Sequence, residues 1–254
     1  MAVENKGKAS HPLLLLVLLL ASLVFAQTAR AAKIKEWRLE QKHYLSGDHV
    51  IYLTPISIRV FNNQIGYQVV SKAPDWKVYA FRDDDKVMRE MTRPEFYENQ
   101  EYHPINDGTG NGKLTKIGTQ SVGGTKVEVF RFGADEKWLG HLPGIPKAAH
   151  DLILAYYKLR PAEGLLMKYS TDGVNAEEKG SSFLASEYKG RLTVVETLRI
   201  NEVPYNPADF KVPTGYKKVV AIEQIMTSAD RRKEADSVFE ELGLGEKLGK
   251  KKSK

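Results

Sequence analysis

The stretch RLTVVETLRINEVPYNPADFKVPTGY, residues 191–216, decides the interpretation of the fold. Its first half alternates apolar and polar residues, which predicts a half-buried β-strand over 191–203. Pro204, Pro207 and Pro213 then end the pattern, because proline cannot donate a backbone hydrogen bond to a neighbouring strand. We therefore predict the last long strand of an antiparallel sheet, followed by a closing segment in which Phe210 fills the end of the sheet.

Earlier segments repeat the strand pattern and are separated by short turns rich in Gly, Asn, Asp or Pro. Connections this short join antiparallel neighbours, as in the glycine turn at Gly123-Gly124. Residues 35–45 fit either a first strand or a short helix. The other expected strands cover 49–61, 65–71, 76–82, 86–91, 114–120, 125–132, 164–169, 181–188 and part of 217–226.

Three segments predict helices. The clearest is 146–159, PKAAHDLILAYYKL, with Pro146 in its first turn and apolar residues at helical spacing. Residues 92–99 begin with Thr92 as an N-cap, and residues 227–242 can be capped by Ser228. Many strands with few helices favour an α+β fold: a curved antiparallel sheet, an unclosed half-barrel, wrapped around one or two helices, plus a C-terminal helix.

The first 31 residues predict an export signal, with a basic start, an apolar run over 12–26 and small residues before a cut near Ala31/Ala32. An uncleaved membrane anchor is the alternative, although the run is shorter than the roughly 20 residues that a spanning helix needs. We expect a periplasmic or secreted protein. The half-barrel domain would cover 32–226, and the C-terminal helix with a lysine-rich tail 227–254.

Composition excludes several classes of site. The chain has no cysteine, so disulfides, thiolate metal sites, thiol nucleophiles and a lipidated N-terminal cysteine are excluded.

Residues 1–31 contribute +2 and the tail lysines +4, which together account for the whole net charge of +6. The body is therefore neutral, and we expect no nucleic-acid partner. The tail is a solvated end or makes weak contact with an anionic membrane through Lys250, Lys251, Lys252 and Lys254.

Two pieces of the chain, KIGTQSVGGTKVEVFRF at 116–132 and PADFKVPTGYKK at 207–218, flank the central helix. Together with the export signal they resemble the outer-membrane lipoprotein carrier and lipoprotein-sorting (LolA/LolB-like) family, in particular its uncharacterised relatives. The resemblance is one of order and pattern over 35–222. It implies an unclosed barrel with helices as a lid and an apolar concavity that holds acyl chains. The C-terminal helix and lysine tail fall outside the family pattern.

The candidate ligand-binding residues are apolar side chains on the predicted strands and central helix, for which core packing is the alternative. They are Val78, Tyr79, Phe81, Phe130, Met167, Leu192, Val194, Leu198, Ile153 and Tyr157. The resemblance further suggests Arg59, on the strand face opposite Ile58 and Val60, as an arginine that anchors the lid. A solvent-facing arginine is the alternative.

No motif for catalysis, metal binding or cofactor binding emerges. The histidines lack metal-ligand spacing, the run Asp83-Asp84-Asp85 fits a solvated turn, and Asp107–Gly118 lacks the glutamate that closes a calcium loop. We therefore expect a non-catalytic binding protein without cofactor or metal, whose partner is a lipid, a lipoprotein or another apolar ligand. The alternatives are a cell-envelope interaction module with a filled core and a protein partner, and a hydrolase.

Overall fold

The computed structural model describes residues 34–98, 113–172 and 190–241. Residues 36–254 belong to one compact unit, and the predicted domain boundaries at 31/32 and 226/227 remain predictions. The strands are β1 (Lys35–His43), β2 (Gly47–Leu53), β3 (Ser57–Asn62), β4 (Tyr67–Lys72), β5 (Lys77–Arg82), β6 (Val87–Met91), β7 (Thr115–Val122), β8 (Thr125–Phe132), β9 (Asp135–Gly140), β10 (Leu165–Asp172), β11 (Arg191–Pro204) and β12 (Lys217–Lys218). The helices are α2 (Arg93–Glu98), α3 (Lys147–Tyr156), the 3-10 helix η1 (Pro207–Phe210), α6 (Glu223–Met226) and α7 (Ala229–Glu241).

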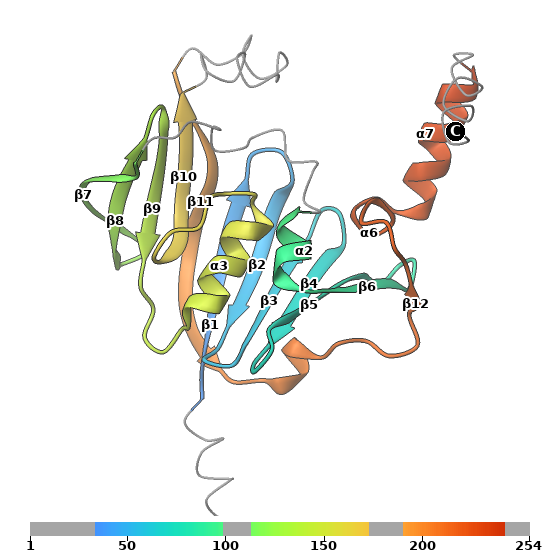
Figure 1. Ribbon diagram of the computed structural model, residues 1–254, viewed down its shortest axis with the longest axis horizontal. Helices are drawn as coiled ribbons and strands as arrows, with labels where there is room; N and C mark the ends of the chain where they lie inside the picture. Colours follow the sequence, from blue (N-terminus) through green and yellow to red (C-terminus); the bar gives the residue numbers. More distant parts are fainter. Residues whose placement is uncertain (1–33, 99–112, 173–189, 242–254) are drawn as a thin grey trace, which may run out of the picture. The chain divides into compact units, whose positions relative to one another are not determined.

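These strands form one sheet in the order β12-β6-β5-β4-β3-β2-β1-β11-β10-β9-β8-β7 (Figure 1). Neighbours from β6 to β1 and from β11 to β7 are antiparallel, whereas β12 runs parallel to β6. The two ends of this order, β12 and β7, do not pair with each other in the described part of the chain. The sheet is therefore an unclosed half-barrel in an α+β fold, which confirms the predicted fold class.

One face of the sheet forms the main core. Ile51, Val60, Val69 and Ala80 lie directly opposite one another across β2 to β5, and all four are buried. Side chains alternate between the two faces of a strand, so this row lies on a single face. Helices α2 and α3 lie side by side against the sheet (Figure 1), and Ile153 of α3 belongs to the same core as the row.

The opposite face carries a second, smaller core and the closing segment. Val70, Phe81 and Met88 form this outer core, with Tyr216 packed against it. The 3-10 helix η1 contacts β3 and β4 there. Phe210 is 1% exposed, and it lies in η1 on this outer face. That Phe210 fills the end of the half-barrel stays a prediction.

Two predicted strands differ from the structure, and a third is not described. Residues 49–61 form two strands, β2 and β3, because Pro55 interrupts the ladder and Thr54 N bonds back to Ser57 O at 2.9 Å. Residues 217–226 contain only the two-residue β12, followed by α6. The predicted strand 181–188 lies outside the described residues, and β11 lies between β10 and β1.

The two ends of the sheet differ. The described strand β7 is exposed from Thr115 to Ser121, and its outer side has no neighbouring strand in the described order. At the other end, β12 covers part of β6 through the bonds Lys217 N to Lys86 O at 2.8 Å and Val219 N to Met88 O at 2.9 Å.

Helix α2 begins with the predicted cap. Thr92 N and Oγ1 both donate to the Glu95 carboxylate, at 2.7 and 2.8 Å, and Glu95 N donates to Thr92 Oγ1 at 3.3 Å. This reciprocal arrangement satisfies backbone donors at the start of the helix. Phe96 then points into the core with no exposed surface, whereas Tyr97 is 41% exposed. One buried phenyl ring therefore anchors a helix of six residues.

We predict that Phe96→Ala lowers the free energy of unfolding by about 3–5 kcal/mol, because the substitution leaves a cavity under a short helix. Tyr97→Ala is the matched control on the next position, and it should cost about 1 kcal/mol or less. Urea denaturation followed by far-UV circular dichroism measures both. Equal losses for the two variants would contradict the packing of α2 described above.

Candidate functional site

The structure divides the ten predicted cavity residues among three environments. Six are at most 4% exposed in the main core: Val78, Met167, Ile153, Tyr157, Leu192 and Val194. Phe130 is partly buried at the edge of that core. Tyr79 and Phe81 belong to the outer core, and Leu198 is 53% exposed. The ten side chains therefore do not line one common cavity, because neighbours on a strand such as Val78 and Tyr79 point to opposite faces.

Arg59 lies on the outer face and does not reach α3. Its Nη2 donates to Gln68 Oε1 at 2.7 Å, and its Nη1 donates to the Asp209 backbone oxygen at 3.3 Å. The Asp209 carboxylate is 3.9 Å away. Arg59 therefore holds the closing segment η1 against the sheet, which is a different anchor from the predicted lid contact.

A buried polar cluster beneath α3 was not predicted. Tyr157 Oη donates to Gln41 Oε1 at 2.9 Å, and Gln41 Nε2 donates to the Leu166 backbone oxygen at 2.8 Å and to Thr197 Oγ1 at 2.9 Å. These bonds tie α3 to β1, β10 and β11. Burial raises the pKa of Tyr157 above its usual range, so the phenol stays neutral and remains a donor.

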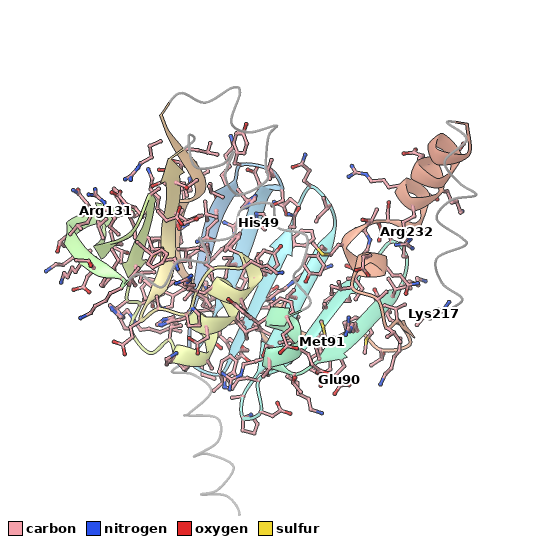
Figure 2. All side chains as sticks on the ribbon, turned by 45° about the horizontal axis from the view of Figure 1, so that its top comes forward. His49, Glu90, Met91, Arg131, Lys217 and Arg232 are labelled. Carbon is pink, nitrogen blue, oxygen red and sulfur yellow. The ribbon has the colours of Figure 1, made fainter. Side chains whose placement is uncertain are left out.

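Two histidines of this cluster each accept a hydrogen bond on one ring nitrogen. Asn62 Nδ2 can only donate, so it donates to His49 Nε2 at 2.8 Å, and His49 Nδ1 donates to Gly47 O at 3.0 Å (His49 is labelled in Figure 2). His43 Nδ1 accepts from Leu45 N and Ser46 N, at 3.2 and 3.1 Å. Each ring therefore keeps one unprotonated nitrogen.

Aromatic stacking joins the same two histidines to α3. The His43 ring stacks on Tyr157 with centroids 5.7 Å apart, and the His49 ring meets Tyr156 edge to face at 5.6 Å. Tyr156 in turn stacks on Tyr67 of β4 at 5.8 Å. The C-terminal end of α3 thus docks through directional contacts, whereas the middle of the helix buries aliphatic residues such as Leu152 and Ile153.

A hollow of about 360 Å³ lies between α2 and α3. Most of its lining is apolar, and three charged residues lie among the lining side chains. The lining residues are Arg93, Pro94, Tyr97, Lys147, Asp151, Leu152, Ala155 and Pro161. Leu152 and Ala155 also belong to the main core, so the hollow borders the side chains that fill the half-barrel. Its volume is at the small end of the roughly 300–1,000 Å³ of small-molecule sites.

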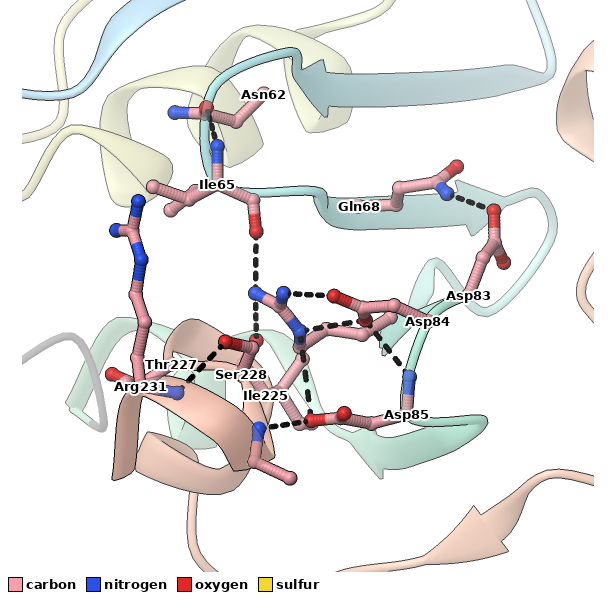
Figure 3. A network of polar contacts seen from close by, with 12 residues as sticks. Asn62, Ile65, Gln68, Asp83, Asp84, Asp85, Ile225, Thr227, Ser228 and Arg231 are labelled. Carbon is pink, nitrogen blue, oxygen red and sulfur yellow. Dashed lines mark hydrogen bonds and ion pairs between the residues drawn. The ribbon is translucent and has the colours of Figure 1, made fainter. Parts of the chain in front are cut away.

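A second polar network surrounds Arg82, whose side chain is 5% exposed (Figure 3). Its guanidinium donates to the Ile65 and Ile225 carbonyls and to the Asp84 carboxylate, and it lies 3.9 Å from Asp85. These donors lower the pKa of Asp84. Asp85 also accepts from Ala229 N at 2.7 Å. The network therefore attaches the start of α7 to the sheet, and two of the three carboxylates in the 83–85 turn serve this attachment.

The described residues do not assemble a metal site. Among residues 34–98, 113–172 and 190–241, no group of three or more His, Asp or Glu side chains is placed to hold an ion. The calcium-loop candidate at 107–118 falls partly outside these ranges, and His103 falls wholly outside them. The described helices also include none that is long and apolar enough to cross a membrane. The predicted export signal lies outside the described residues.

Comparison with known proteins adds little to this geometry. No protein-family model matches the sequence, and no curated protein matches it. Among solved structures, the chain is similar to a LolA superfamily protein from Nitrosomonas europaea, with 9% identity over 70% of this chain and 89% of that chain. The TM-score is 0.22. A likeness of this size does not assign the chain to that superfamily.

His150 provides a test of how α3 is held. The residue is 6% exposed, and its Nε2 is buried without a hydrogen-bond partner. Burial lowers the pKa of His150, and so do His141, whose ring centroid is 6.2 Å away, and Lys147; Asp151 acts in the opposite direction. Protonation would therefore place an unsatisfied N–H inside the core.

We predict that the stability contributed at His150 falls as the pH drops below about 6.5, where the unfolded state takes up a proton that the native state resists. For this one group, the free energy of unfolding can change by at most about 1.4 kcal/mol per pH unit. Urea denaturation at pH 7.5 and 5.0 should show a smaller loss for His150→Phe than for the wild type. His141→Gln removes a neighbouring ring that also lowers the pKa of His150, so it should reduce the pH-dependent loss by less than His150→Phe does. A His150→Phe variant with the wild-type pH dependence would contradict this account.

Proposed function

We propose that this chain is an exported, non-catalytic binding protein that holds a lipid or another apolar ligand, such as lipoprotein acyl chains, in its half-barrel. In this proposal α2 and α3 form the cover over the ligand. The observation that supports it best is the largely apolar hollow between these helices, which borders the core through Leu152 and Ala155. Burial of a ligand chain there would contribute about 0.8 kcal/mol per methylene.

The way α3 docks supports a cover that can move. Its C-terminal part is held by hydrogen bonds such as Tyr157 to Gln41, and water can replace such bonds at a net cost of about 0.5–1.5 kcal/mol each. In the described structure the protein's own side chains, Ile153 and Met167 among them, occupy the space under α3 with no exposed surface. A long acyl chain would therefore enter at the hollow and continue inward only as α3 shifts.

The same filled core favours a second candidate function. A half-barrel whose interior is permanently occupied by its own side chains would act as an interaction module of the cell envelope. In that case the ligand would be a protein partner at the surface. The two candidates differ in one measurable respect, because only the first requires an apolar molecule to occupy the hollow.

We predict that native mass spectrometry of the purified chain detects a co-purified apolar molecule, and that Ala155→Trp reduces its occupancy. The indole would fill the hollow, and a loss of about 1.4 kcal/mol of binding free energy corresponds to tenfold weaker binding. Val220→Trp is the matched control, because Val220 is 85% exposed and does not line the hollow.

The contrary result is equally clear. A wild-type protein that carries no apolar molecule and binds none of added laurate, dodecyl phosphate and dodecanol would overturn the carrier proposal and support the interaction module. Circular dichroism of both tryptophan variants establishes that they are folded before binding is compared.

A further inference from the structure

The charged residues at the hollow are not equivalent. Lys147 Nζ forms an ion pair with Asp151 Oδ1 at 2.6 Å, so these two charges neutralise each other. Arg93 also lines the hollow and is exposed, but within the described residues its guanidinium has no hydrogen bond or ion pair. Counted over the described residues alone, the hollow therefore carries one uncompensated positive charge at its rim.

The carboxylates near Arg93 are directed elsewhere. Glu95 accepts hydrogen bonds from Thr92 N and Oγ1 in the cap of α2. Glu98 lies five positions after Arg93, which places it about 140° away around the helix. Asp151 is bound to Lys147. Among the described residues, Arg93 is thus a free guanidinium beside a largely apolar surface that includes Pro94, Leu152 and Ala155.

We infer that the hollow binds a single-chain anionic amphiphile, with the chain against the apolar lining and a carboxylate or phosphate head group at Arg93. This inference rests on the proposed function and specifies its ligand class. A guanidinium presents parallel N–H donors that match both head groups in a bidentate manner. The volume of about 360 Å³ suits one short chain and leaves no room for a lipid with several long chains in this conformation.

The test compares three twelve-carbon probes on the full-length protein: laurate, dodecyl phosphate and neutral dodecanol. The two anions are used below the concentrations at which they form micelles, and dodecanol below its solubility limit. Arg93→Gln removes the charge at the hollow. Arg231→Gln is the matched control, because Arg231 is an exposed arginine in α7 whose side chain forms no ion pair with the described residues, and it does not line this hollow. Isothermal titration calorimetry gives the dissociation constants at low ionic strength.

For Arg93→Gln we expect laurate and dodecyl phosphate to bind at least about tenfold more weakly, with dodecanol unchanged, because a charge-assisted hydrogen bond is lost only with the anionic probes. A loss confined to one anionic head group also supports the inference and identifies that group. Arg231→Gln should bind all three probes as the wild type does.

Two results would overturn the inference while the proposed function survives. In the first, laurate and dodecyl phosphate bind Arg93→Gln as tightly as they bind the wild type. In the second, dodecanol loses as much affinity as the anionic probes, which would mean that Arg93 only shapes the hollow. Failure of all three probes to bind the wild type would instead overturn the proposed function itself.

Discussion

The structure depends on covering the apolar row that runs across β2 to β5. A single antiparallel sheet with one apolar face is not stable in water until that face is removed from solvent. Here α3 and the short α2 lie against the sheet, and the concave face that results is filled by Ile153 and its neighbours. The closing segment performs the equivalent task on the outer face with far less apolar area, and Arg59 holds it there.

The covering helix is held by two kinds of contact. Its aliphatic part gains stability from burial, which has no preferred direction. Its tyrosines instead form directional contacts with Gln41 and with two histidines on β1 and β2. Hydrogen bonds of this kind lose little free energy when water replaces them, whereas the phenyl ring of Phe96 has no such substitute. The cover is therefore held by the burial of one phenyl ring at α2 and by buried rings with directional polar contacts at the end of α3.

Much of this fold was predictable from local pattern, because alternation and turn residues are local signals. In β5, period-two alternation directly predicts that Val78 and Ala80 lie on one face and Tyr79 and Phe81 on the other. The pattern did not predict β9, whose sequence DEKWLG buries Asp135, Glu136 and Lys137. Charged residues in a buried strand are paired by tertiary contacts that no local window contains, such as Lys137 Nζ to Arg160 O at 3.2 Å.

The candidate site was less predictable for the same reason. The bond between Tyr157 and Gln41 joins residues 116 positions apart, and the hollow brings together two helices separated by more than 40 positions. The cavity residues were predicted from their apolar character, and this criterion selects residues of the core. A binding surface has to remain partly exposed, and that property depends on how α2 meets α3. The polar residues at alternate positions of β1, Gln41 and His43, were the one available signal of the cluster beneath α3.

The unequal ends of the sheet limit how copies of this protein can associate. Growth of a fibre by strand addition requires two long free edges on every molecule, one to offer and one to receive. In the described part of the chain β7 presents eight residues, whereas the opposite end finishes in a β12 of two lysines. An encounter between β7 strands would therefore join two molecules and stop there, rather than continue into a fibre.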